Sequence, residues 1–90
     1  MYFSGKANCQ FKPGTLKRSK PTEHNLGETV TPHECTAMVL RNFPHANGAK
    51  WGYGIDQHGS CWAQFGATGH HVPLPTWNGK WISCLLTCML

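Results

Sequence analysis

The stretch that decides the fold spans residues 31–35 and reads Thr31-Pro32-His33-Glu34-Cys35. Thr31 is a favoured N-cap residue, Pro32 suits the first helical position, and Glu34 stands where it completes a capping box. One face of the following segment carries the apolar residues Cys35, Met38, Val39 and Phe43. Pro44 ends this pattern, because the residue before a proline is pushed out of the α region. The sequence therefore predicts one amphipathic helix with a cysteine in its first turn.

Two alternating segments after this helix predict an antiparallel hairpin. In the first segment, one face carries the mainly apolar residues Ala49, Trp51, Tyr53 and Ile55. In the second, Cys61, Ala63 and Phe65 alternate with Trp62 and Gln64. Residues 56–59 between them form a predicted turn. This arrangement places Cys61 on the inner face of the hairpin and turns Trp62 and Gln64 outward.

The rest of the chain has weaker signals. Residues 1–30 are polar with scattered apolar positions, and we expect short strands and loops there, with a turn at Pro13-Gly14. Residues 66–75 are rich in Gly, His and Pro and are expected to be a loop. Asn78-Gly79 predicts a tight turn before a final strand at residues 81–86. One helix between short strands indicates a single α+β domain over residues 1–90, with the helix packed on a small antiparallel sheet.

The cysteine pattern favours a disulfide framework. Five cysteines occur in 90 residues, at the widely spaced positions 9, 35, 61, 84 and 88. The absence of a Cys-x-x-Cys pair disfavours zinc-ribbon and thioredoxin-type motifs. Such a framework suits a small secreted, extracellular protein, because oxidising compartments preserve disulfides. A cytosolic location is the alternative. No apolar run approaches the ~18 residues of a membrane span, and residues 1–6 lack the apolar core of a signal peptide.

Strand geometry narrows the pairing of these cysteines. Cys84 and Cys88 on one strand would lie ~13 Å apart, at about 3.3 Å per residue, and a disulfide needs less than ~7 Å. Cys35 and Cys61 both face inward, so we expect them to pair. Cys9 would then join Cys84 and tie the first strand to the last. Cys88 is left free or intermolecular, and other pairings of five cysteines stay open.

The order of these elements resembles the PAN/Apple superfamily of small extracellular modules. The matching segments are Thr31-Pro32-His33-Glu34-Cys35, Ala46-Asn47-Gly48-Ala49-Lys50-Trp51, Gly59-Ser60-Cys61-Trp62 and Trp81-Ile82-Ser83-Cys84-Leu85-Leu86. The resemblance implies a non-enzymatic module that binds proteins or carbohydrates, with helix-to-sheet and N-to-C-terminal disulfides. Apple domains usually place a second cysteine in the helix, and this helix has only Cys35. Parts of the same segments are also similar to short modules in extracellular proteins of marine invertebrates, including lectin-type proteins.

Four tryptophans suggest a binding surface for sugars. Trp51 is expected to face inward with Tyr53, while exposed aromatic rings elsewhere would stack on sugar rings and polar neighbours would bind hydroxyl groups. The candidate ligand-binding residues are Trp62, Gln64, His70, His71, Trp77, Asn78, Lys80 and Trp81. The alternative is that the tryptophans cover a thin core.

A compact basic run offers a different kind of site. The formal net charge is +4, and Lys17, Arg18 and Lys20 stand close together. They could bind sulfated glycans through charge, although such a run is often only a solvated loop. Nucleic acid is an unlikely partner for an extracellular protein.

Catalytic and metal patterns are weak. His58 and Cys61 fit a turn histidine beside a disulfide better than a thiol enzyme. His70-His71, with His45 or His58, lacks zinc-ligand spacing. We therefore expect no enzyme, no metal and no cofactor.

The sequence thus predicts a secreted, non-enzymatic carbohydrate-binding module, a small lectin that binds a carbohydrate or glycoprotein. Multivalent binding would follow from a homodimer formed through Cys88 or the final strand. The alternative is a protein-interaction, matrix, pheromone-like or defence module. Such a module would act through its basic face on sulfated glycans or anionic surfaces.

Overall fold

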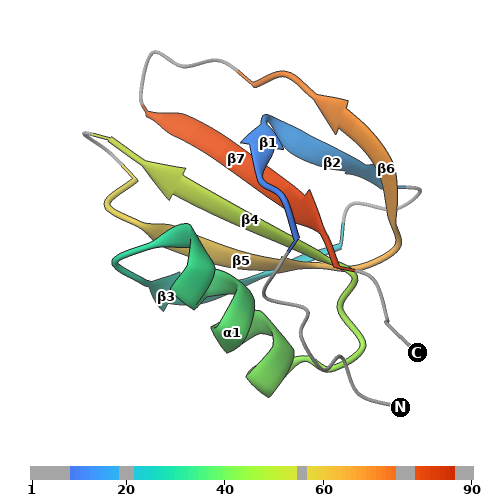
Figure 1. The fold of residues 1–90 in the computed structure, drawn as a ribbon, viewed down its shortest axis with the longest axis horizontal. Coiled ribbons are helices and arrows are strands. Elements are labelled where there is room, and N and C mark those ends of the chain that lie inside the picture. Colours follow the sequence, from blue (N-terminus) through green and yellow to red (C-terminus); the bar gives the residue numbers. More distant parts are fainter. Residues whose placement is uncertain (1–8, 19–21, 55–56, 75–78, 87–90) are drawn as a thin grey trace.

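The computed structural model describes residues 9–18, 22–54, 57–74 and 79–86. Its elements are β1 (Lys12–Pro13), β2 (Thr15–Arg18), β3 (Glu23–Glu28), α1 (Pro32–Asn42), β4 (Gly48–Tyr53), β5 (Ser60–Gln64), β6 (Ala67–Val72) and β7 (Lys80–Leu85). Within these ranges, an antiparallel five-stranded sheet has the order β1-β7-β4-β5-β3, and β2 pairs with β6 in a separate antiparallel ribbon (Figure 1). No described helix is long and apolar enough to cross a membrane.

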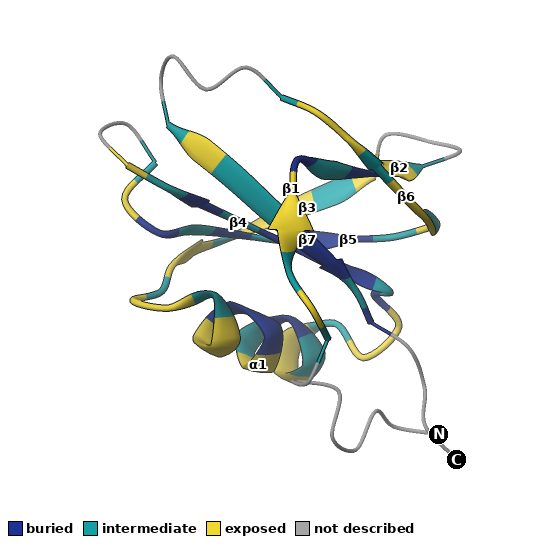
Figure 2. Ribbon diagram, turned by 45° about the horizontal axis from the view of Figure 1, so that its top comes forward, coloured by how far each residue is buried: buried dark blue, intermediate teal, exposed yellow. Residues whose placement is uncertain are grey.

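The layers stack in the order helix, sheet, ribbon. α1 packs against β3, β4 and β5, while the ribbon contacts β4 and β7. Figure 2 shows α1 below the large sheet and the β2–β6 ribbon above it. A helix on antiparallel sheets with two disulfides confirms the predicted α+β class.

The helix begins as its sequence predicts. The Thr31 hydroxyl accepts a hydrogen bond from the Glu34 N–H at 3.1 Å, and the Glu34 carboxylate accepts one from the Thr31 N–H at 3.2 Å. This capping box satisfies donors that the first helical turn leaves unpaired. At the other end Phe43 is the C-cap, and its N–H donates to the Val39 carbonyl at 2.7 Å. The helix therefore stops just before Pro44.

The central hairpin β4–β5 is confirmed, and its register assigns side chains to faces. Trp51 lies opposite Cys61 in the register, and Lys50 lies opposite Trp62. Directly opposed residues of an antiparallel pair share a face. Because Cys61 is bonded to Cys35 of the helix, Trp51 lies on the helix face and Lys50 on the ribbon face.

Both predicted disulfides are present. Cys35 and Cys61 have Cα atoms 5.5 Å apart, and those of Cys9 and Cys84 are 5.7 Å apart. Cys88 lies outside the described residues. Apart from cysteine, the buried cluster around these bonds contains mostly small side chains: Val39, Ala46, Ala49, Ala63 and Leu86. A core this thin leaves covalent links a large share of the stabilisation.

One predicted loop proves to be a strand. Residues 67–72 form β6 and pair with β2, with Leu16 opposite His71 in the register. The sequence of β6 shows no alternation of apolar residues that would predict a strand. The buried apolar side chain of this ribbon is instead Leu16, which belongs to β2. Pro13-Gly14 does turn the chain, but it carries it from the large sheet into the ribbon rather than around a hairpin.

Candidate functional site

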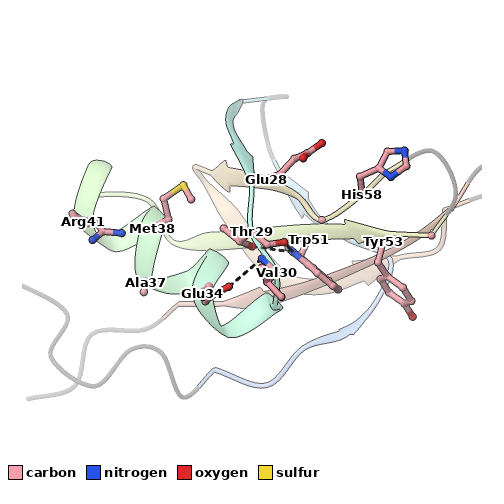
Figure 3. A pocket seen from close by; sticks show the side chains of 12 residues that line it. Glu28, Thr29, Val30, Glu34, Ala37, Met38, Arg41, Trp51, Tyr53 and His58 are labelled. Carbon is pink, nitrogen blue, oxygen red and sulfur yellow. Dashed lines mark hydrogen bonds between the residues drawn. The ribbon is translucent and has the colours of Figure 1, made fainter.

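Two of the cavities lined by described residues border the large sheet. The larger of these two, here called the Trp51 groove, has a volume of about 770 Å³ and lies between α1 and the residues at the end of β3, the end of β4 and the start of β5. Its principal side chains are Glu28, Met38, Arg41, Trp51, Tyr53 and His58 (Figure 3). The groove lies on the helix face of the sheet, because Trp51 and Cys61 share that face.

Two stacked aromatic rings are the main apolar surface of the Trp51 groove. Trp51 and Tyr53 are two residues apart on β4, so they project from the same face. Their ring centroids are 5.3 Å apart with an interplanar angle of 21°. The indole N–H of Trp51 donates to the Thr29 hydroxyl at 3.0 Å, which holds the ring in place. The result is an oriented aromatic surface whose polar N–H is already satisfied.

Polar side chains border this aromatic surface. In Figure 3, Glu28 and His58 project above the strands, Trp51 and Tyr53 extend below them, and Arg41 stands on the helix at the far end of the groove. Glu34 is committed to the helix start, since its carboxylate also accepts from the Val30 N–H at 3.0 Å. The groove therefore contains a carboxylate acceptor, a guanidinium donor and two apolar rings. Those are the groups that a sugar ring with several hydroxyls requires.

The smaller cavity, here called the Trp81 pocket, has a volume of about 440 Å³. It takes side chains from both faces of the sheet near the start of β7, because Trp81 lies opposite Gly52 on the ribbon face and Lys80 lies opposite Tyr53 on the helix face. A Cβ atom on Gly52 would come within 2.7 Å of the Trp81 ring, so the indole lies directly on the glycine backbone. Tyr53, at the end of β4, lines both cavities.

The Trp81 pocket gathers part of the site that the sequence predicts. His71, Lys80 and Trp81 all line it, although they come from two different strands. His70 is exposed on β6 and does not line either cavity. Trp77 and Asn78 lie outside the described residues.

The expectation of an open outer face around Gln64 is wrong. Its side chain is fully buried, and its amide nitrogen donates to the Thr15 hydroxyl and the Glu23 carboxylate, both at 2.8 Å. Trp62 is half-buried, and its N–H donates to the Ser60 hydroxyl at 2.8 Å. The reason is the ribbon, whose Thr15 and Leu16 cover this face of the sheet.

A charged cluster holds the ribbon and sheet together. The Glu23 carboxylate receives Lys50 at 2.8 Å and Arg18 at 3.1 Å. Burial alone would raise the pKa of Glu23, but hydrogen bonds from Lys50 and Gln64 and two positive charges outweigh it and lower the pKa below its ordinary value. The Lys50 ammonium also lies 4.6 Å from the centroid of the Trp81 ring.

This cluster corrects the predicted anion site. The side chain of Arg18 is only 13% exposed and is paired with Glu23, so it is not available to an external anion. Lys17 is exposed on β2, and Lys20 lies outside the described residues. In the described ranges no three His, Cys, Asp or Glu side chains gather as metal ligands, and this includes His70-His71 with His45 or His58.

Trp51 and Tyr53 are the site residues that sequence reasoning missed. They were expected to face inward, and they do lie on the helix face, but both rings are only half-buried. Their spacing of two residues already predicted a shared aromatic face. How much of that face an 11-residue helix covers depends on its placement, which the sequence pattern does not encode.

No protein-family model matches this chain, and no curated protein or solved structure matches it either.

Proposed function

We propose that this chain is a secreted, non-enzymatic carbohydrate-binding module, a small lectin of PAN/Apple-like fold. The Trp51 groove is its primary sugar site. The sugar ring lies against the Trp51 and Tyr53 rings, and its hydroxyl groups bond to Glu28, His58 and Arg41. The observation that carries this proposal is the ordered aromatic stack, with centroids 5.3 Å apart, inside a cavity of about 770 Å³.

The energetics of such a site favour a neutral sugar. Aromatic rings remove the apolar C–H face of a sugar from water, and this gain needs no charge on the ligand. Thr29 already fixes the Trp51 ring, so little side-chain entropy is lost when a ligand binds. Mixed charge around the groove supplies both donors and acceptors without selecting an ionic ligand.

Two further features support the module's class. The helix-to-sheet bond Cys35–Cys61 and the terminal bond Cys9–Cys84 follow the order that the PAN/Apple resemblance implies. Disulfides are typical of proteins that work outside the reducing cytosol. The module binds multivalently as a homodimer formed through Cys88 or the final strand. Non-reducing mass spectrometry detects a dimer linked through Cys88.

A protein-interaction module is the second candidate. Val30 borders the Trp51 groove with 84% of its surface exposed, and Met38 of the helix lines the same groove. An apolar peptide segment would bury both side chains. Binding of apolar peptides without any glycan binding would favour this second function.

The first experiment is a glycan array followed by calorimetric titration of the best neutral ligand. Trp51→Leu keeps apolar bulk but removes the aromatic surface, and it should weaken binding by about tenfold or more. Trp62→Leu is the matched control, because it removes an indole on the opposite face of the sheet. Thermal unfolding of both variants checks that each is folded.

Two results contradict the proposal. One is an array on which the folded wild-type protein binds no glycan. The other is an equal loss of affinity in Trp51→Leu and Trp62→Leu, which would place the ligand elsewhere.

A further inference from the structure

We propose that the Trp81 pocket is a second, separate site, which binds an anionic sugar through a sulfate or carboxylate group. It shares only Tyr53 with the Trp51 groove, and the charges of its side chains differ from those of the groove. This inference goes beyond the neutral-sugar site and does not depend on it.

The charge of the pocket is the first argument. Its charged or titratable side chains are those of Lys80, His71 and Tyr53, and none of its described lining residues is acidic. The Trp51 groove, in contrast, contains Glu28 and Glu34. A ligand carboxylate or sulfate would meet these two acids beside Arg41 in the groove, but only basic and neutral side chains among the described residues of the Trp81 pocket. The two cavities therefore sort neutral from anionic ligands.

The hydrogen bonding of His71 is the second argument. Its Nδ1 lies 3.1 Å from the hydroxyl of the buried Ser83. When that hydroxyl donates to Nδ1, the neutral ring carries its proton on Nε2 and donates from there. Nε2 has no hydrogen-bond partner among the described residues, so it is available to an anionic oxygen.

The apolar walls supply the third argument. Trp81, Leu74 and Pro13 line the pocket beside Lys80 and His71. An inorganic ion would make no apolar contact with these walls, whereas a sugar places its C–H groups against them. Charge-assisted bonds from Lys80 and His71 then orient the anionic group.

Protonation of His71 strengthens this site in mild acid. Burial, and secondarily the charge of Lys12, lower the pKa of His71 in the free protein. Lys12 of β1 is the positive charge that acts on it, Lys80 of β7 lines the same pocket, and Ser83 is its neutral partner. A bound anion offsets the repulsion from Lys12 and favours the protonated ring. By linkage, affinity for the anion should rise as the pH falls through the pKa of His71.

The test titrates a sulfated disaccharide, the same disaccharide without sulfate, and inorganic sulfate into the whole protein. We expect measurable affinity only for the sulfated sugar at this pocket, and a loss of roughly tenfold in Lys80→Gln. Lys17→Gln is the matched control, since it removes the same charge from an exposed position on β2. It should leave the affinity unchanged. Trp51→Leu should also leave sulfated-sugar binding intact, which separates this site from the neutral-sugar site.

Three results overturn the inference. Equal binding of the sulfated and plain sugars would remove the role of the anion. Equal losses in Lys80→Gln and Lys17→Gln would reduce the effect to overall charge. Inorganic sulfate that binds as tightly as the sulfated sugar would show that the apolar walls contribute nothing.

Discussion

At the scale of single residues, Gly52 determines the position of an aromatic wall. The Trp81 ring rests on the Gly52 backbone, and an added Cβ atom would approach the ring to 2.7 Å. Folded proteins essentially never hold two such atoms so close, so either the ring or the strand must shift. The absence of a side chain at Gly52 therefore lets the Trp81 ring lie against the backbone of β4, with the Lys50 ammonium over the ring.

We predict that Gly52→Ala displaces the Trp81 ring and lowers the free energy of unfolding by about 1–3 kcal/mol, as overpacking does elsewhere. Urea unfolding followed by tryptophan fluorescence measures both effects. Gly69→Ala on β6 is the control, since a Cβ atom there meets nothing within 4 Å. If the two variants unfold alike with unchanged fluorescence, the contact between Gly52 and Trp81 does not exist in solution.

At the scale of elements, the attachment of the ribbon to the sheet is polar as well as apolar. Arg18 of β2 and Lys50 of β4 meet on the carboxylate of Glu23, which belongs to β3. Gln64 of β5 links the same carboxylate to Thr15 of β2. Removing the carboxylate would leave two partly buried cations without their counter-charge.

We predict that Glu23→Gln lowers the free energy of unfolding near pH 7 by about 2 kcal/mol. The folded-state pKa of Glu23 lies below its ordinary value of 4.5. Its contribution is therefore fully present above that value and is lost as the pH falls through the folded-state pKa.

Wild type and Glu23→Gln should thus converge in stability at strongly acidic pH. Denaturant titrations at several pH values measure this convergence. Glu28→Gln, at the exposed far end of β3, should leave the ribbon's attachment unchanged. A stability gap for Glu23→Gln that does not change with pH would contradict the electrostatic account.

Some of these elements could be predicted from the sequence, and others could not. The helix and the β4–β5 hairpin were predictable because their signals are local: a capping box at Thr31 and an alternation through Trp51 and Cys61. β6 was not, because its buried partner Leu16 lies about 50 residues earlier in the chain. The candidate site was half predictable. The sequence grouped His71 with Lys80 and Trp81 as ligand-binding candidates, and these three do line one pocket. It expected Trp51 and Tyr53 to face inward, and they line the larger groove instead.

At the scale of the whole molecule, two disulfides compensate for a thin core. The large side chains among the fully buried residues are few, and the cluster around Cys35, Cys61 and Cys84 is mostly alanine and cysteine. Domains of this size bury too little apolar surface to be robust without such links. The loops that the bonds close span 26 and 75 residues.

We predict that replacing Cys35 and Cys61 together by serine lowers the free energy of unfolding by about 3.5 kcal/mol, and that the same change at Cys9 and Cys84 lowers it by about 4.5 kcal/mol. The longer loop restricts the unfolded chain more, which sets the order of the two losses. Thermal and denaturant unfolding of the two double variants measures both losses in the free energy of unfolding. A larger loss for the Cys35–Cys61 variant would mean that packing around the helix outweighs loop closure.

The Cys9–Cys84 bond also has a mechanical consequence. It joins the segment that leads into β1 to the strand β7, so the chain between these residues forms a closed covalent ring. Tension applied before Cys9 and after Cys84 passes through the sulfur–sulfur bond and bypasses the β-sheet. Stretched by those two ends, the oxidised molecule should bear force without extending residues 10–83. After reduction, the same pull should strip β1 and β7 from the sheet and unravel the fold.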